Sequence, residues 1–339
     1  MPSGVAVLAS VNSATLVGID GQPVTVEVHV SSGLPGYQVV GLPDASVRES
    51  RERVRAALLS SGLAWPLRRI TVNLAPGGVR KTGAGLELAV ALGLLAANEE
   101  LPAGGLDDVA VLGELGLDGA VRPVPGTLAL VDALARAGVP TVVVPAANAA
   151  EASLVAGVTV RAARSLAELR ACLKGEEEWP AWADLPEPRV ASDDAFDDEP
   201  LDLREVRGLA FARRALEVAA AGCHHLLFVG PPGTGKTMLA RRLATILPPL
   251  SPAEALEVTR IHSAAGRPVH GRLVSQPPFR APHHTASTPA LVGGGTGRPR
   301  PGEVTLAQGR ESKKSLVLLH APRPSRMQRV RLVGGAAGQ

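Results

Sequence analysis

Residues Gly230–Thr237 read GPPGTGKT, which fits the pattern G-x-x-x-x-G-K-[ST] of a phosphate-binding loop. The glycines allow the tight curl that points consecutive backbone N–H groups at phosphate oxygens. Lys236 supplies a mobile positive charge for the β- and γ-phosphates, and Thr237 supplies a hydroxyl for Mg²⁺ at the positive end of a helix. The pattern therefore predicts that a nucleoside triphosphate, ATP or GTP, is bound with Mg²⁺ by Gly230, Pro231, Pro232, Gly233, Thr234, Gly235, Lys236 and Thr237.

The flanking sequence has the form that such a loop requires. His225–Val229 is a short apolar run typical of a strand, and Met238–Leu247 has helical spacing of apolar residues. We expect a strand, the loop and then a helix. A second helix is predicted at 208–221, before the strand, and a third at 252–261.

Composition limits the class of protein. A chain of 339 residues has room for about two domains. Apolar residues make up 45% and aromatic residues 2%, so the cores are expected to be built from Leu, Val and Ala. Cys172 and Cys223 lie far apart, which argues against a disulfide framework or a zinc site. Neither a signal peptide nor an apolar run of about 18 residues is evident, so we expect a cytoplasmic protein without a membrane partner.

The composition changes abruptly at 176–200. This stretch holds ten acidic residues, one basic residue and four prolines, as expected of an acidic linker or a solvated loop. It divides the chain into a domain at 1–175 and a nucleotide-binding part at 201–307, with a basic tail at 308–339.

The first domain has the alternating pattern of an α/β fold. Turn residues separate the predicted segments, and Ser165 is the expected N-cap of the last helix. Strands are predicted at 5–8, 15–19, 24–30, 69–74, 109–112, 141–144 and 158–160, and helices at 45–60, 86–97, 127–137, 146–155 and 165–173.

Longer motifs point to a family. The run Ala212–Leu250 resembles the nucleotide-binding core of magnesium-chelatase-like AAA+ ATPases, and more narrowly the bacterial ComM/YifB group. The segments Pro278–Thr285, Leu291–Gly295 and Arg300–Glu303 are similar to the insert of that group. This resemblance implies ATP and Mg²⁺ as cofactors. It also implies a homo-oligomeric ring, a hexamer in intact relatives, that moves on DNA and promotes branch migration in natural transformation or recombination.

The first domain resembles the proteolytic domain of Lon, a ribosomal S5 domain 2-like fold. Lys81–Gly85, and Val111–Glu114 continuing to Gly138, carry this resemblance. It places Gly85 where Lon has its nucleophilic Ser and Leu130 where Lon has its Lys. Neither side chain can perform that chemistry, so we expect no protease activity. Lys81, the nearby amine, is expected to form a surface salt bridge.

The sequence after the loop departs from the family. A P-loop ATPase needs a second apolar strand ending in Asp, usually followed by Glu, to hold Mg²⁺ and polarise the attacking water. After Thr237 the acidic residues are Glu254, Glu257, Glu303 and Glu311, and none of them ends such a strand. The run Ser315–His320 is apolar but ends in His. Sensor, arginine-finger and lid segments were not found, so hydrolysis by this chain is in doubt and its catalytic residues are unassigned.

The basic tail has two explanations. From Arg298 to the end there are nine Lys or Arg and two Glu. The tail is either the product of a frameshift or truncation after about residue 307, or a genuine segment that contacts DNA. Aromatic residues that could stack on single strands are absent from it.

Four functions are open at this point. The first is an ATP-driven motor on DNA. The second is a non-catalytic nucleotide-binding fragment or assembly subunit, with exposed apolar surface. A magnesium-chelatase subunit is the third and a Lon-type peptidase the fourth, both less favoured. His262, His270, His283 and His284 lack the spacing of a zinc site, so they are expected to form structural hydrogen bonds or to line a subunit interface rather than bind metal.

Overall fold

The computed structural model describes residues 7–102, 104–181, 201–222, 224–267, 269, 271–283, 285–294, 300–307, 316–317 and 329–333. These residues form two compact units. Unit 1 contains the described residues of Met1–Val190 and His262–Arg272, and unit 2 contains those of Ala191–Ile261 and Leu273–Gln339. The predicted linker begins at residue 176, and its described part stays with unit 1, where Trp179 packs against the core and lies under the Arg161 guanidinium.

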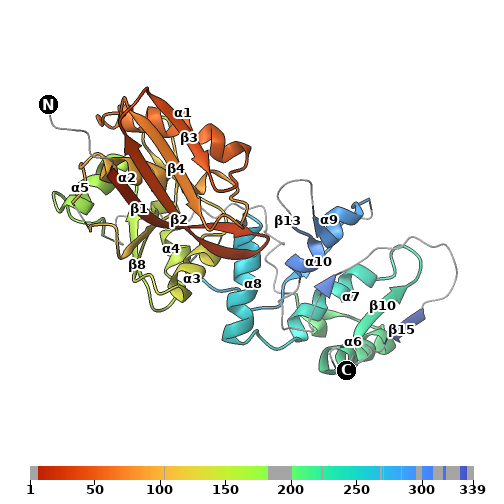
Figure 1. Cartoon of the computed structure of the whole chain (residues 1–339). Coiled ribbons are helices and arrows are strands. Elements are labelled where there is room, and N and C mark those ends of the chain that lie inside the picture. The colour runs from red at the N-terminus through yellow and green to blue at the C-terminus, as the bar shows by residue number, and fades with distance from the viewer. Residues whose placement is uncertain are drawn as a thin grey trace. The chain divides into compact units, whose positions relative to one another are not determined.

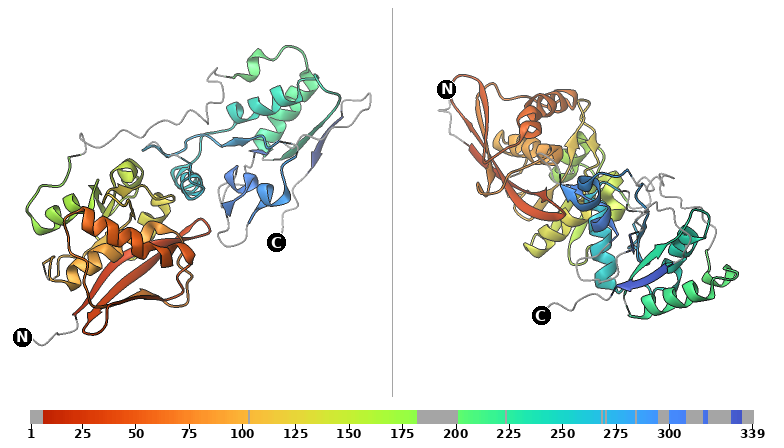
Figure 2. Two further views of the ribbon diagram at one scale, coloured as in Figure 1. Left: turned by 90° about the horizontal axis from the view of Figure 1, so that it is seen from above. Right: turned by 90° about the vertical axis from the view of Figure 1, so that its right-hand side faces the viewer.

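Unit 1 is an α/β unit built on a seven-stranded sheet of order β3-β4-β2-β1-β5-β8-β9 (Figures 1 and 2). Pairing is antiparallel for β1–β2 and β2–β4 and parallel for the other four neighbours, so the sheet is mixed but mostly parallel. The strands of this sheet are β1 (Val7–Val17), β2 (Asp20–Ser31), β3 (Gly36–Val40), β4 (Arg69–Ala75), β5 (Val109–Val111), β8 (Thr141–Pro145) and β9 (Thr159–Ala163). A separate hairpin pairs β6 (Glu114–Leu115) with β7 (Val121–Arg122).

The parallel half of this sheet buries both of its faces. On β8, Val143 belongs to one core cluster, whereas Val142 and Val144 belong to the other. Such alternation follows from the two-residue period of a strand and is typical of a sheet covered by helices on both sides. The first cluster includes residues of α1 (Ala45–Ser60), α2 (Glu87–Ala97) and α5 (Leu166–Lys174), and the second includes residues of α3 (Thr127–Arg136) and α4 (Ala149–Ala152).

Helix α2 packs unusually close to the sheet. A Cβ on Gly93 would lie 2.5 Å from Cγ2 of Val28 on β2. Only glycine leaves room for the strand there, which explains its presence within an otherwise Leu- and Ala-rich helix despite its poor helix propensity.

Some of the helices and strands predicted for unit 1 are confirmed, and others are not. The helix at 45–60 and the N-cap role of Ser165, whose side chain accepts from the Glu168 N–H, are confirmed. The prediction of two separate strands at 5–8 and 15–19 is wrong, because β1 runs unbroken from Val7 to Val17, paired residue by residue with β2. The helix predicted at 146–155 is shorter, with a 3₁₀ turn at Ala146–Asn148 before α4.

The end of helix α8 (Pro252–Ala264) belongs to unit 1. Its Ser263 hydroxyl donates a very short hydrogen bond to Oε1 of Glu151, and the Ser263 carbonyl accepts from the Gly126 N–H at 3.0 Å. Glu151 is buried and also accepts from the Leu128 N–H, at the start of α3, at 2.8 Å. Desolvation raises the pKa of Glu151, and these hydrogen bonds oppose that rise.

Unit 2 is a smaller α/β arrangement. A 3₁₀ turn at Leu203–Glu205 and α6 (Ala210–Gly222) precede β10 (His225–Val229), which is followed by α7 (Lys236–Leu243) and a 3₁₀ turn at Ala244–Ile246. Its core cluster is small and joins Leu203, Val206, Leu216 and Leu239. The remaining elements are short: β11 (Phe279–Arg280), α9 (Thr288–Val292), β12 (Gly293–Gly294), β13 (Arg300–Pro301), α10 (Glu303–Leu306), β14 (Leu316–Val317) and β15 (Arg329–Val333).

The helices of the described part of the chain bear on whether it could cross a membrane. None of them provides the apolar length that a membrane crossing requires.

A pH experiment tests the buried carboxylate. The pKa of Glu151 is higher in the folded protein than in the unfolded chain. At pH values between these two pKa values, the folded protein therefore binds more protons than the unfolded protein does. The free energy of unfolding contributed by this group should therefore be full at lower pH and should fall as pH rises through the raised pKa. We expect Glu151→Gln to flatten this decline in urea unfolding measured as a function of pH.

The matched control for that experiment is Glu52→Gln, at a side chain that is 70% exposed. This control should keep the slope of the wild-type protein. An identical slope for Glu151→Gln and the wild type would contradict the assignment.

Candidate functional site

The predicted phosphate loop connects β10 to α7 in unit 2. Two of its glycines have left-handed backbone, with φ of 81° at Gly233 and 80° at Gly235, and Gly235 is the N-cap of α7. L-residues rarely adopt this conformation, so glycine is needed at both positions. The strand, loop and helix thus follow one another in the order that the sequence predicts, and the free N–H groups of the first turn of α7 face the loop.

Lys236 folds back over the loop that precedes it. Its Nζ lies 2.9 Å from the carbonyl oxygen of Gly230 and 2.6 Å from that of Pro231. The Thr234 hydroxyl donates to the same Pro231 carbonyl at 3.0 Å. The ammonium group therefore sits inside the curl of the backbone, where a phosphate group would meet it. Thr237 lies at the second position of α7, with an exposed side chain.

A second left-handed turn lies beside the loop and was missed by the sequence analysis. Gly208 and Leu209 have φ of 68° and 49°. Positive φ is costly for Leu, and no local sequence pattern announces it. The turn brings Leu209 Cδ1 to 3.4 Å from the position of a Cβ on Gly235, so an apolar side chain borders the loop.

Arg242 ties α7 to the segment before α6. Its Nε donates to the Asp202 carbonyl at 2.9 Å, and its Nη2 donates to Oε2 of Glu205 at 2.8 Å. The Arg242 guanidinium lowers the pKa of Glu205. These contacts fix the start of unit 2 against the helix that carries Lys236.

The described acidic residues that follow the loop lie on other elements of the chain. The Glu254 carboxylate accepts from the N–H and hydroxyl of Ser251 at the start of α8. Glu257 also lies on α8, and Glu303 is paired with Arg280. Glu311 lies outside the described residues. None of the described carboxylates after Thr237 therefore stands at the end of a strand beside the loop.

The described strand that pairs with β10 is β15. The two strands are antiparallel, from His225 opposite Val333 to Val229 opposite Arg329. The sequence of β15 is RVRLV, which supplies two arginines and no carboxylate. The apolar run predicted at 315–320 is described only as β14, which pairs with β11. Most of the basic tail lies outside the described residues.

The predicted insert joins two of its motifs through one ion pair. Arg280 donates from Nε to Oε2 of Glu303 at 2.6 Å and from Nη2 to Oε1 at 3.1 Å. This two-point geometry holds β11 against α10 more firmly than a single contact would. In the first motif, Nδ1 of His283 lies 2.7 Å from the Thr285 hydroxyl.

The described residues contain no group of three or more His, Cys, Asp or Glu that could hold a metal ion. His270 and His284 lie outside them, so the expected structural role of the four histidines remains a prediction, with a hydrogen bond seen at His283.

The positions of the missing Lon dyad lie in unit 1. A Cβ on Gly85 would lie 3.5 Å from Val124, and Leu130 is buried in the same core cluster as Val124. Apolar side chains therefore line both positions.

Lys81 corrects the sequence analysis. It was expected to form a surface salt bridge, but its side chain is fully buried and its ammonium donates to the Pro76 carbonyl. Burial lowers the pKa of Lys81. The prediction of a surface ion pair is therefore wrong.

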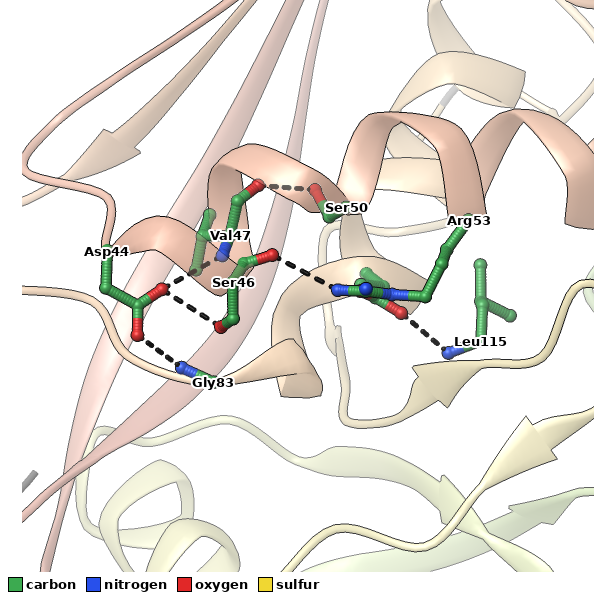
Figure 3. Close-up of polar contacts among 8 residues, drawn as sticks. Asp44, Ser46, Val47, Ser50, Arg53, Gly83 and Leu115 are labelled. Atoms are coloured by element: carbon green, nitrogen blue, oxygen red, sulfur yellow. Dashed lines mark hydrogen bonds and ion pairs between the residues drawn. The ribbon is translucent and has the colours of Figure 1, made fainter.

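A polar network fastens the loop that carries Lys81 (Figure 3). Asp44, the N-cap of α1, accepts from the Val47 N–H at 2.9 Å and from the Gly83 N–H at 3.1 Å. Arg53, further along α1, donates to the Ser46 carbonyl at 3.1 Å and to Oε1 of Glu87 at 2.6 Å. The sequence analysis missed this network because its partners are far apart in the chain.

The ion pair of the insert can be tested by stability. Arg280→Ala should lower the free energy of unfolding by about 2 kcal/mol, because a partly buried carboxylate loses two charged hydrogen bonds. Arg280→Lys should lose less, since it keeps the charge but not the fork geometry. Both are measured by urea unfolding of the full chain.

The control for that experiment is Arg214→Ala, which breaks an exposed pair with Glu217. Its effect should stay within about 1 kcal/mol. A loss at Arg280 no larger than this control would show that the pair contributes little.

Comparison with known families matches both parts of the chain. The family described as "Magnesium chelatase, subunit ChlI" matches residues 202–310, and "Subunit ChlI of Mg-chelatase" matches residues 26–148. Part of the first unit is also similar to a Lon protease of Mycolicibacterium smegmatis, with 30% identity over 141 residues, which is 39% of this chain and 18% of that protein.

Longer matches cover most of the chain. An uncharacterized protein of Mycobacterium tuberculosis is 48% identical over 297 residues, which is 87% of this chain. Competence protein ComM of Haemophilus influenzae and the uncharacterized protein YifB of Escherichia coli are each 42% identical over 300 residues, which is 88% of this chain. The chain spans 58% of the length of each of these three relatives. By these similarities, the chain belongs to the ComM/YifB-like group of magnesium-chelatase-related proteins.

Proposed function

We propose that this chain binds ATP with Mg²⁺ through Gly230–Thr237. The observation that carries the proposal is the position of Lys236, whose Nζ lies inside the loop, against the carbonyls of Gly230 and Pro231. The backbone N–H groups of the loop would hold the phosphates, and the Thr237 hydroxyl would contribute to Mg²⁺. The bound ion would neutralise phosphate charge. Leu209, at the border of the loop, would offer an apolar surface to the base.

We propose further that the ATP-bound protein acts on DNA as a homo-oligomer, with the hexameric ring that the family resemblance implies. The support is family membership and the printed name of one relative, Competence protein ComM. The activity proposed is movement on DNA that promotes branch migration in transformation or recombination. A cytoplasmic location remains a prediction.

For unit 1 we propose a Lon-type fold that has lost peptidase chemistry. The partial similarity to a Lon protease supports the fold. Gly85 and Leu130, at the positions of the dyad, lack the groups that a Ser–Lys mechanism requires.

A second candidate is a non-catalytic nucleotide-binding or assembly subunit. Two observations favour it. The strand beside β10 has no carboxylate to hold Mg²⁺ or polarise water. One face of β10 is also open, with Leu227 44% and Val229 39% exposed, as expected of a sheet that associates with further structure. A chelatase subunit is less favoured, because both family models carry the magnesium-chelatase name but the matches that cover most of the chain include ComM and YifB.

Binding is tested first at Lys236. Lys236→Ala should weaken binding of a fluorescent ATP analogue by tenfold or more, since a charged hydrogen bond is worth about 1.5–3 kcal/mol and about 1.4 kcal/mol corresponds to a factor of ten. Lys174→Ala, which removes a surface charge from unit 1, should bind as the wild type does. Equal affinity of the Lys236 variant and the wild type would contradict the nucleotide site.

Hydrolysis is tested separately. Phosphate release by the wild-type chain should be close to that of Lys236→Ala, with or without DNA, because nearly all catalysis of phosphoryl transfer depends on positioned charge that the described residues do not supply. DNA-stimulated turnover that Lys236→Ala abolishes would favour the motor over the non-catalytic subunit.

A further inference from the structure

The outer flank of helix α1 carries a row of exposed arginines. Arg48, Arg51 and Arg55 are spaced three and four residues apart, so they lie on one side of the helix. Arg53 lies on another flank and donates to Oε1 of Glu87 at the start of α2. The row therefore faces away from α2, toward solvent.

A fourth arginine adjoins the start of this row. Residues 42–44, just before α1, are held to Lys81 by two backbone hydrogen bonds: the Lys81 N–H donates to the Leu42 carbonyl at 3.1 Å, and the Asp44 N–H donates to the Lys81 carbonyl at 3.0 Å. The exposed Arg80 therefore directly precedes a residue whose backbone is tied to the segment before α1. We call Arg48, Arg51, Arg55 and Arg80 the arginine row.

The charge of the arginine row is hardly compensated. Its ion pair is the 3.6 Å contact between Arg51 and Glu52, whose side chains are 45% and 70% exposed. Within the described part of the chain, Arg48, Arg55 and Arg80 have no ion pair. Arg136, Arg164 and Arg214, by contrast, each pair with an acid three or four residues away in the chain.

We propose that the arginine row binds the phosphodiester backbone of DNA. The inference rests on the proposed DNA-related function and adds the surface that would make the contact. Arg48 to Arg55 covers about 10 Å of helix axis, so the three guanidinium groups can reach neighbouring phosphates of one DNA strand. Guanidinium groups bind phosphate oxygens in two-point geometry.

The phosphodiester backbone suits this row better than an acidic peptide does. The guanidinium groups stand on a rigid helix, and the exposed Leu42 and Leu59 lie beyond the two ends of the row rather than between its arginines. Contacts of this kind fix position without reading sequence, so binding should be independent of base sequence and strongly dependent on salt.

The test compares two triple variants of the full chain without nucleotide. Arg48→Gln/Arg51→Gln/Arg55→Gln removes the row, and Arg136→Gln/Arg164→Gln/Arg214→Gln removes the same charge from paired surface sites. Fluorescence anisotropy is recorded with a labelled duplex and a single strand of about 30 nucleotides, between about 50 and 200 mM salt. The row variant should bind tenfold or more weakly, with a salt slope smaller by about 3, and the control should bind as the wild type does.

Each outcome decides between the two proposals. If the wild type binds DNA and the row variant binds equally well, the arginine row is wrong and the DNA-related function stands. If the wild type binds no DNA, both the arginine row and the DNA-related function are wrong. The proposal of a nucleotide site would still stand if the protein binds the fluorescent ATP analogue. If a polyglutamate peptide displaces DNA at equal charge concentration, the row is a peptide site and the proposal is overturned. Should the row variant unfold, Arg48→Gln and Arg55→Gln each reduce the salt slope by about 1.

Discussion

A single buried carboxylate connects the distant parts of unit 1. Glu151 accepts hydrogen bonds from the Leu128 N–H, the Asn148 side chain and the Ser263 hydroxyl. Burying an acid is unfavourable, and desolvation accordingly raises its pKa, but three donors offset much of that cost. Because Ser263 follows Glu151 by 112 residues, the packing of α3 and α4 depends on a segment that lies within the match to the magnesium chelatase family. Unit 1 is therefore not a continuous stretch of sequence.

The nucleotide loop, in contrast, depends on residues that are close together in the sequence. Left-handed backbone at Gly233 and Gly235 turns the chain so that Lys236 reaches the carbonyls behind it. Two glycines and a lysine at fixed spacing are visible in the sequence, which is why the candidate site could be located from the sequence alone. Leu209 could not be found in this way, because its positive φ opposes its own preference and is imposed by packing around the loop.

The fold shows the same division between local and distant causes. The limits of α1 follow from the Asp44 cap and from apolar residues at helical spacing, all within one segment, so they could be predicted. The continuity of β1 across residues 9–14 depends on pairing with β2, and the burial of Lys81 depends on the turn at Pro76. Charge patterning places a lysine at the surface by default, and only the surrounding structure shows that this one is inside.

Binding and hydrolysis make separate demands on a nucleotide site. Phosphates can be held by backbone N–H groups and Lys236, all of which one loop supplies. Hydrolysis needs carboxylates from a neighbouring strand as well. In unit 2 the strand beside β10 carries arginines, Glu303 is occupied by Arg280, and Glu254 caps α8. A loop that supplies its own phosphate ligands, beside a strand without carboxylates, favours nucleotide binding over hydrolysis. The arginine row on unit 1 depends on neither nucleotide binding nor hydrolysis, since its attraction to a polyanion comes from charge already exposed on α1.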